Sequence, residues 1–359
     1  MHHRQLTLGL AALVLVGCAF TTPAFAQLPS SVVTAASPPP EAIEKSLDVQ
    51  VGKLLSPDPA LWSQGRTTMI GDVSKQDAST GFLDAYALSL NAHLLPLTKN
   101  KDARVRLNAA IVAARVAAKA KNGRLAPVTL ALLKDSSDAV VLWALQSAKF
   151  VVPPLLAIQD SKDADDLGKA VVQAAQTHTT PSVIEEAYHT LLLDPTPQGP
   201  SLVGDISPKV LSSFLQNTLA LYDFRVKLYD TEPEPPKDSQ LDTAATVFLT
   251  SDKVWGVQTK AQQGQTLALM LALARGAAKQ NAAVPSPEMF DVVKRTGQAL
   301  SVVANRMPGQ KEFSDAAKKL SQLPNSASPD EINPALDSLE AAIKALGLPT
   351  PPATPTPEK

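Results

Sequence analysis

The chain is short of cysteine, aromatic residues and net charge, and each shortage excludes a class of protein. Cys18 is the only cysteine in 359 residues, so a disulfide framework and a site built from several thiolates are both excluded. Aromatic residues make up 4% of the chain, which leaves few side chains to stack against bases or sugars. The 33 basic and 34 acidic residues nearly cancel, so the chain lacks the basic surface of a nucleic-acid-binding protein. We therefore expect no nucleic-acid partner.

The first 26 residues are typical of a secretory signal peptide. Arg4 gives a basic start, residues 6–20 form an apolar run, and the small-x-small pattern at 24–26 fits a cleavage site before Gln27. The run is shorter than the about 20 residues that a transmembrane helix needs, and no later stretch qualifies. We expect an exported protein, periplasmic or in the cell envelope of a bacterium, with no transmembrane span.

A second interpretation of the same segment is a lipid anchor. Leu15-Val16-Gly17-Cys18 resembles the box at which bacterial lipoproteins are cut, after which the cysteine becomes a lipid-bearing N-terminus. Cleavage after Ala26 would instead remove Cys18 and leave a mature chain with no thiol. The sequence leaves both alternatives open.

Apolar residues recur at the spacing of amphipathic helices along the mature chain, and prolines fall between these segments. We predict a linker over 27–40, a helix over 41–55 and irregular chain over 60–78. Further helices are predicted over 80–97 and 102–121, the second capped by Asp102. The expected fold class is all-α.

A helix pair recurs between residues 80 and 193, and the second helix of each pair carries Val-x-x-x-Ala. The copies are Val105/Ala109, Val140/Ala144 and Val183/Ala187, at shifts of 35 and 43 residues, with the third copy predicted to begin after Pro153-Pro154. Recurrence of a helix pair with a variable period indicates a helical solenoid. Small residues allow helices to cross closely, so we expect Ala109 and Ala144 to be buried.

The first of these copies resembles a HEAT-type (armadillo-like) repeat. It has the Leu-rich end of a first helix at 94–97, an Asp at the turn, Asp102, and the pattern Val-Arg-x-x-Ala at 105–109. The resemblance covers residues 80–193 only and is degenerate, since Val141 and Ile184 stand where the family has Arg. It implies an irregular α-solenoid that serves as a protein-binding scaffold.

The second half of the chain is predicted to be helical without this repeat. Residues 194–206 are rich in Pro and Gly and are predicted to link a HEAT-like domain at 41–193 to a C-terminal helical domain at 207–347. Predicted helices there span 208–229, 241–250, 251–281, 287–307, 311–323 and 329–346. The Pro/Thr-rich residues 348–359 are predicted to be a disordered tail.

No catalytic or cofactor motif is found. The chain has no Gly-x-Ser-x-Gly elbow, no Ser-x-x-Lys dyad and no Gly-rich phosphate loop. Glu186 and His189 form one Glu-x-x-His pair, whereas dinuclear carboxylate bundles need two such pairs. His93 is expected in the core, and no spacing brings His178 to His189. We therefore predict no catalytic residue, no cofactor and no metal site.

Two further groups of residues could take part in binding. Basic and amide side chains lie near one face of the helix at 102–121, namely Lys101, Arg104, Asn108, Arg115 and Lys119. They form either a surface for an anionic partner or the solvated rim of the solenoid, and we favour the rim. Trp143 and Trp255 are expected to be core residues rather than binding platforms.

The sequence thus favours an exported, non-enzymatic helical-repeat scaffold that binds other proteins in the cell envelope. One alternative is an all-α hydrolase or lyase whose site is assembled from scattered carboxylates in a deep cleft. A second alternative is a structural envelope lipoprotein.

Overall fold

The computed structural model describes residues 27–193, 206–232, 234, 236–307 and 309–349, and this part of the chain is all-α. It contains sixteen α-helices, two short 3-10 helices and no strand, as the sequence predicted. The predicted signal peptide at 1–26, with the lipoprotein-like box at Cys18, lies outside the described residues. So do most of the predicted linker at 194–206 and residues 350–359 of the predicted tail.

The helices follow one another with short connections. Their bounds are α1 Ser30–Val33, α2 Pro40–Leu54, α3 Pro59–Val73, α4 Thr80–Leu94, η1 Leu95–Lys99, α5 Ala103–Ala120, η2 Gly123–Leu125, α6 Ala126–Leu132, α7 Asp138–Ala157, α8 Ser161–Thr177, α9 Pro181–Leu191, α10 Pro208–Thr231, α11 Ser239–Leu249, α12 Asp252–Val257, α13 Lys260–Ala283, α14 Pro287–Asn305, α15 Lys311–Ser321 and α16 Pro329–Ala345.

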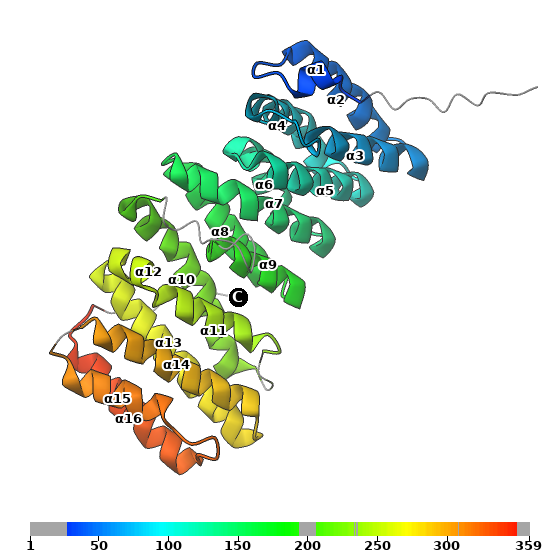
Figure 1. Cartoon of the computed structure of the whole chain (residues 1–359). Helices are drawn as coiled ribbons and strands as arrows, with labels where there is room; N and C mark the ends of the chain where they lie inside the picture. Colours follow the sequence, from blue (N-terminus) through cyan, green and yellow to red (C-terminus); the bar gives the residue numbers. More distant parts are fainter. Residues whose placement is uncertain (1–26, 194–205, 233, 235, 308, 350–359) are drawn as a thin grey trace, which may run out of the picture.

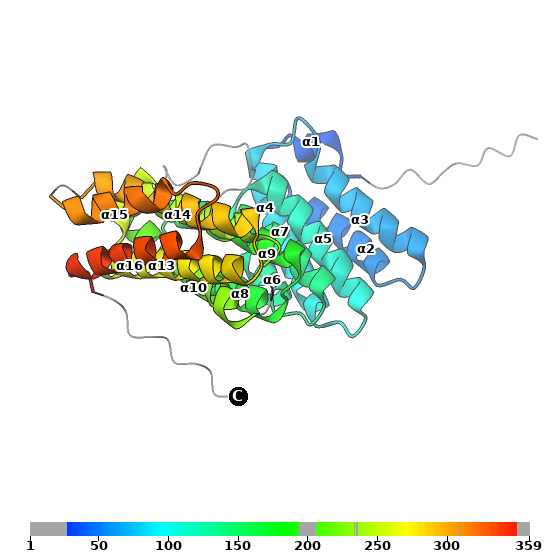
Figure 2. The same cartoon turned by 90° about the horizontal axis from the view of Figure 1, so that it is seen from below.

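The described helices stack as pairs in two layers, which makes the fold an α-solenoid. Helices α2, α4, α6, α8, α10, α13 and α16 contact one another in that order and form the first layer. The second layer consists of α3, α5, α7, α9, α11, α14 and α15, also in contact in that order. Figure 1 shows the stack running from the N-terminal helices at one end to the C-terminal helices at the other. Figure 2 shows α14 and α15 in one row and α13 and α16 in the other.

The stacking continues past residue 193, which the sequence did not predict. Helix α10 packs on α8 just as earlier first-layer helices pack on each other. The side-chain amide of Asn217 donates to Asp165 over 3.0 Å, and the Thr218 hydroxyl donates to the Leu191 carbonyl over 3.0 Å. Buried apolar residues from both halves belong to one continuous core. The C-terminal region is therefore an extension of the solenoid rather than a separately packed domain.

Two N-terminal predictions are wrong. Residues 27–40 are not a linker, because they include α1 and bury Leu28, Val32 and Val33 against the core. Residues 60–78 are not irregular, because most of them form α3. The Asp58 carboxylate caps this helix by accepting from the Ala60 amide over 2.8 Å, and Pro59 occupies its first position. Proline at the first position of a helix loses no intrahelical hydrogen bond, so Pro59 marks a start and not only a stop.

The sequence also misplaced three helix ends. Pro153 and Pro154 lie inside α7, where Pro153 is buried, so the third pair begins later, at Ser161. Helix α5 ends at Ala120, one residue earlier than predicted, because the next residue, Lys121, has a left-handed φ of 46°. The predicted helix over 251–281 is two helices, α12 and α13.

The break between α12 and α13 has a clear local cause. The Thr259 hydroxyl accepts from the Gln262 amide, and the Gln262 side chain accepts from the Thr259 amide. This reciprocal capping box fixes a new helix start at Lys260. The apolar periodicity that runs through both helices obscures that start in the sequence.

The chain end packs where a tail was predicted. Leu348 is partly buried against the core. A Cβ atom on Gly264 of α13 would lie 2.2 Å from the carbonyl oxygen of Pro349, so the glycine allows this close approach. The prediction of a disordered segment is therefore wrong for residues 348 and 349.

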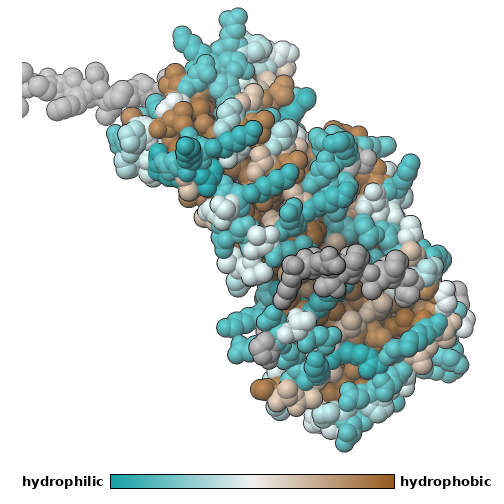
Figure 3. All heavy atoms as spheres, turned by 180° about the vertical axis from the view of Figure 1, so that it is seen from behind, coloured by the Kyte–Doolittle hydropathy of each residue, from teal (hydrophilic) through white to brown (hydrophobic). Residues whose placement is uncertain are grey.

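Contrary to the prediction that no stretch after residue 20 qualifies, one described helix, α7, is long and apolar enough to cross a membrane, and 61% of its apolar window is buried inside the protein. It packs against α5, α6, α8 and α9, so the core of the solenoid accounts for its apolar composition. The face of the molecule seen in Figure 3 is mainly hydrophilic, with apolar surface confined to smaller patches.

Ala109 and Ala144 are both fully buried, as predicted. Replacing Ala109 by Leu is expected to lower the free energy of unfolding by about 1–3 kcal/mol, because the extra carbons have no space in the packed core. Urea denaturation followed by circular dichroism measures the change. Ala103→Leu at the exposed start of the same helix is the control and should change stability little. Equal stability of the two variants would contradict the assigned packing.

Candidate functional site

Three cations link consecutive helices of the second layer, and we call them the cation ladder: Arg66, Arg115 and Lys149. Each reaches the sixth residue of the next second-layer helix, which is Asn108 in α5, Trp143 in α7 and Glu186 in α9. The contacts are repeated in position although the receiving residues differ in chemistry. These side chains are exposed or half-buried, except for Asn108, which is buried.

The first rung joins α3 to α5. The Arg66 guanidinium donates to the Asn108 side-chain oxygen over 3.1 Å. The centre of the Trp62 ring lies 5.8 Å from both the Arg66 and the Arg104 guanidinium carbons, and both are cation–π distances. Asn108 completes the cluster by donating to the Arg104 carbonyl over 2.9 Å. Two arginines thus contact the half-buried Trp62 ring, whose indole nitrogen is buried.

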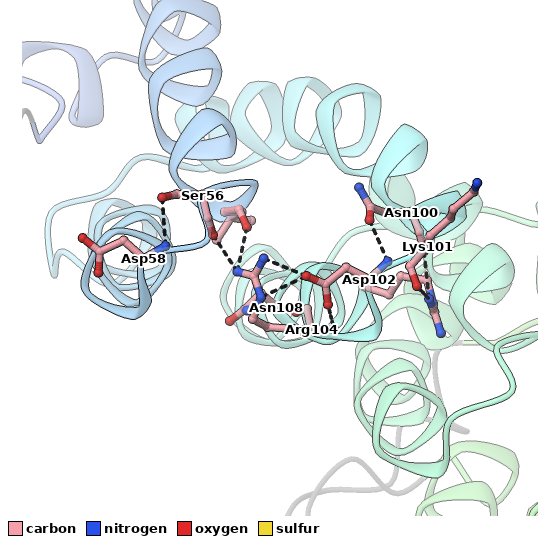
Figure 4. A network of polar contacts seen from close by, with 9 residues as sticks. Ser56, Asp58, Asn100, Lys101, Asp102, Arg104 and Asn108 are labelled. Carbon is pink, nitrogen blue, oxygen red and sulfur yellow. Dashed lines mark hydrogen bonds and ion pairs between the residues drawn. The ribbon is translucent and has the colours of Figure 1, made fainter.

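Arg104 is fixed by the turn between α2 and α3 as well as by its own helix start (Figure 4). Its guanidinium donates to the Ser56 carbonyl over 2.9 Å and to the Asp102 carboxylate over 2.8 and 3.1 Å. Asp102 also caps α5 by accepting from the Arg104 amide over 2.8 Å. That backbone hydrogen bond and the guanidinium hold the pKa of Asp102 below its usual range. The predicted cap is confirmed, and Arg104 is not available as a free cation.

The second rung joins α5 to α7. The Arg115 guanidinium carbon lies 5.1 Å from the centre of the Trp143 ring. Arg115 is exposed, and Trp143 is half-buried beneath it. The prediction that Trp143 is a core residue is therefore only partly right, whereas Trp255 is buried as predicted, with 5% of its surface exposed.

The five predicted basic and amide positions, four on α5 and Lys101 just before it, have different roles. Arg104, Asn108 and Arg115 each contact a neighbouring helix or turn, whereas Lys101 and Lys119 are exposed. The group is therefore not a uniform basic patch. It is a row of arginines held against tryptophans and flanked by two lysines.

The third rung joins α7 to α9. The Lys149 ammonium lies 3.0 Å from one oxygen of the Glu186 carboxylate, and the His189 ring lies 3.8 Å from the same oxygen. Burial raises the pKa of Glu186, but the neighbouring His189 and Lys149 outweigh it, so the pKa lies below its usual value. The Glu-x-x-His pair of the sequence is thus part of an ion-pair network.

Successive turns are also joined, outside the ladder. Arg106 contacts Asp135 in the next turn over 2.6 Å, and the Asp138 carboxylate lies 2.7 Å from the ring of His178 in the turn after it. In the first link the basic residue comes earlier in the chain, and in the second link the acidic residue does. The second link is therefore made by His178, whereas the first is made by Arg106. Val141, which stands where the second repeat would have that arginine, takes no part in it.

The histidines of the described chain do not converge. His178 contacts Asp138, His189 contacts Glu186, and the half-buried His93 contacts Asp48 over 3.1 Å. Within the described residues, no group of three His, Cys, Asp or Glu side chains has the geometry to hold a metal ion. His93 lies at the contact of α2 and α4 rather than in the core as predicted.

We expect the purified mature protein to bind no structural transition metal, because tight zinc sites need three or four protein ligands. Mass spectrometry under non-denaturing conditions measures this directly. A stoichiometric metal adduct that disappears in His189→Ala would contradict the prediction, and the His93→Ala variant serves as the control.

A second polar cluster is buried between α9, α10 and α11, and no motif in the sequence indicates it. The Asp242 carboxylate, fully buried, accepts from Tyr188 over 2.6 Å, from Tyr229 over 2.9 Å and from Arg225 over 3.1 and 3.0 Å. Burial and the neighbouring carboxylate raise the pKa values of both tyrosines, so they remain hydrogen-bond donors. Arg225 also pairs with Asp238 over 2.6 Å. The cluster is internally satisfied and holds three helices together.

A cavity of about 440 Å³ lies beside this cluster, and its lining combines carboxylates with an aromatic side chain, as the enzyme alternative requires. Apolar Phe224 and Leu228 and acidic Glu232 and Asp238 are among its lining residues. The Asp238 carboxylate there is already paired with Arg225. Asp165 and Asp166, the adjacent carboxylates noted in the sequence, have different partners: Asp165 contacts Asn217, and Asp166 contacts Lys162.

Comparison with known proteins gives no family for this chain. No family model matches it, and no curated protein matches it either. Crystal structures of two engineered proteins are similar to it in part. The first is 15% identical, with a TM-score of 0.41 over 84% of this chain and 96% of that one; the second is 13% identical, with a TM-score of 0.32 over 88% and 93%. TM-scores this low do not establish a common fold, so the solenoid assignment rests on the packing of the helices themselves.

Proposed function

We propose that this protein is an exported, non-enzymatic scaffold of the HEAT type that binds another protein through the second-layer face carrying the cation ladder. The observation that supports this most is the set of arginines in cation–π contact with Trp62 and Trp143, which together join three consecutive second-layer helices, α3, α5 and α7. Tryptophan and arginine are the residues that most often dominate the binding energy of protein interfaces. The export part of the proposal depends on the signal-like residues 1–26.

The contacts around Trp62 favour binding for a second reason. Ordering a long side chain when a complex forms costs about 0.5–1.5 kcal/mol. Arg66 and Arg104 are already ordered by hydrogen bonds to Asn108 and Ser56, so much of this cost is met in the free protein. A partner with acidic and apolar groups would complement such a surface, because arginine offers both a charge and a flat stacking face.

Site-specific photo-cross-linking in a bacterial envelope extract tests the proposal. A photoreactive residue at the exposed position of Lys119, one turn beyond Arg115, should give one discrete adduct, and Arg115→Glu should abolish it. The control places the same residue at Lys169, exposed on the first-layer helix α8, where we expect no such adduct. Identical adduct patterns at both positions, or an adduct that persists in Arg115→Glu, would overturn the assigned face. The mass of the mature N-terminus tests export and distinguishes cleavage from lipidation.

A further inference from the structure

Asp72, near the end of α3, is a buried carboxylate that lacks a full set of partners. Its side chain has no exposed surface. One oxygen accepts from the Leu28 amide over 3.1 Å, whereas the other, Oδ2, is buried and has no hydrogen-bond partner among the described residues. Burying an ionised carboxylate without a full set of hydrogen-bonding or ionic partners destabilises the folded protein. An additional cation or hydrogen-bond donor at Oδ2 would therefore stabilise it.

The surroundings of Asp72 supply only part of that compensation. The Lys75 ammonium lies 3.9 Å from the oxygen that already contacts Leu28, and it donates to the Leu28 carbonyl over 2.8 Å. From α4, the buried Tyr86 faces this region, but its hydroxyl donates to the Met69 carbonyl over 3.2 Å. Burial raises the pKa of Asp72 more than Leu28 and Lys75 lower it.

The chain segment that contacts Asp72 begins at the predicted cleavage site. Gln27 is exposed, and its neighbour Leu28 is buried with its amide on the carboxylate. Hydrolysis of the Ala26–Gln27 peptide bond leaves a carboxylate on Ala26. It also converts the Gln27 nitrogen from a neutral amide into an ammonium group with three donors. That ammonium lies one residue from the amide already bound to Asp72.

We propose that Asp72 is the binding site for the α-ammonium group of Gln27, a cation that exists only after the leader has been removed by cleavage after Ala26. The new N-terminus completes the partners of Asp72 and fastens residues 27–33 to α3 and α4. Processing thereby stabilises the first helix pair of the solenoid. The inference takes only the position of the cleavage from the export proposal. It can be tested separately, because the same N-terminus can be generated by proteolysis in vitro.

The test compares two N-terminal forms of the chain, one starting at position 27 and one starting at Ala24, each produced by specific proteolysis of a fusion. Both carry Gln27→Ala, because an N-terminal glutamine can cyclise with loss of ammonia and so lose its charge. Each form is made with Asp72, with Asp72→Asn and with Asp77→Asn. Asp77 is the matched control, since it is an exposed carboxylate that contacts the same segment through Ser30.

We expect the form starting at position 27 to melt about 3 °C above the form starting at Ala24. The difference should disappear in Asp72→Asn and persist in Asp77→Asn. A difference that survives Asp72→Asn, or no difference with Asp72 intact, would overturn the proposal.

A second measurement does not depend on thermal stability. The ion pair raises the pKa of the α-amine, so acylation of the position-27 amine at pH 7 should be slower by about threefold or more than in Asp72→Asn. Equal acylation rates would contradict the ion pair even if Asp72→Asn unfolds more easily. Failure of either measurement leaves the proposed binding face untouched, because cross-linking from position 119 tests that face independently.

Discussion

Replacing Asp242 by Ala is expected to lower the free energy of unfolding by about 3–5 kcal/mol, because removing one partner of a buried ion pair leaves the other charge uncompensated. The variant leaves the Arg225 guanidinium, 5% exposed, with Asp238 as its one remaining acidic partner. It also leaves the buried hydroxyls of Tyr188 and Tyr229 without their acceptor. Urea denaturation followed by circular dichroism measures the total effect. Hydrogen exchange should show that α9, α10 and α11 lose protection first.

The matched control for Asp242 is an exposed carboxylate in an ion pair of the same fold. Asp291 pairs with Arg295 on α14, and its side chain is 55% exposed. Asp291→Ala should cost at most about 1 kcal/mol, since exposed pairs contribute little. If the two variants lose similar stability, the buried cluster does not hold the three helices together in the way described.

Replacing Gly297 by Ala is expected to cost about 3 kcal/mol, at the upper end for overpacking, because backbone and not side chain occupies the space. A Cβ atom at position 297 would lie 2.7 Å from the Ser321 nitrogen and 3.0 Å from the Leu320 carbonyl carbon. These atoms belong to α15, so the methyl group can be accommodated only if α14 and α15 move apart. Thermal and urea denaturation of the variant measure the loss.

A second glycine provides a control, because its replacement by Ala should raise the free energy of unfolding instead of lowering it. Gly52 lies in α2 and is exposed, and a Cβ atom added to it would have no neighbouring atom within 4 Å. Gly52→Ala should therefore stabilise the protein by about 0.5–1 kcal/mol, as expected for Ala over Gly within a helix. A loss of stability in both variants would show that the position in a helix, and not the contact with α15, decides the effect at Gly297.

Local signals in the sequence predicted most of the helices. Apolar residues at helical spacing and a capping residue such as Asp102 both act within one or two turns, so the helix at 102–121 was predicted correctly. Errors arose at prolines, because proline can begin a helix or lie within one as well as end it. Pro59 begins a helix, and Pro153 lies within one because tertiary packing outweighs its local cost.

The residues of the candidate site could be predicted only in part from such local signals. The row on α5 could be seen because Arg104, Asn108 and Arg115 share one helix face. Their partners Trp62 and Trp143 could not be assigned, since each lies on another helix and the contacts depend on how the layers stack. The Asp242 cluster was missed for the same reason, because Tyr188 is 54 residues away from its acceptor. Such contacts have no periodic signal.

The last helix pair enters the two layers in the opposite order from every pair before it. Helix α15 follows α14 in the second layer, and α16 returns to lie against α13 in the first. The order in which the chain enters the two layers is therefore reversed in the last described pair. A further helix pair appended after Leu346 would therefore begin in the second layer, whereas the pairs before α15 begin in the first. A fusion partner attached there would leave from the first layer, away from the tryptophans.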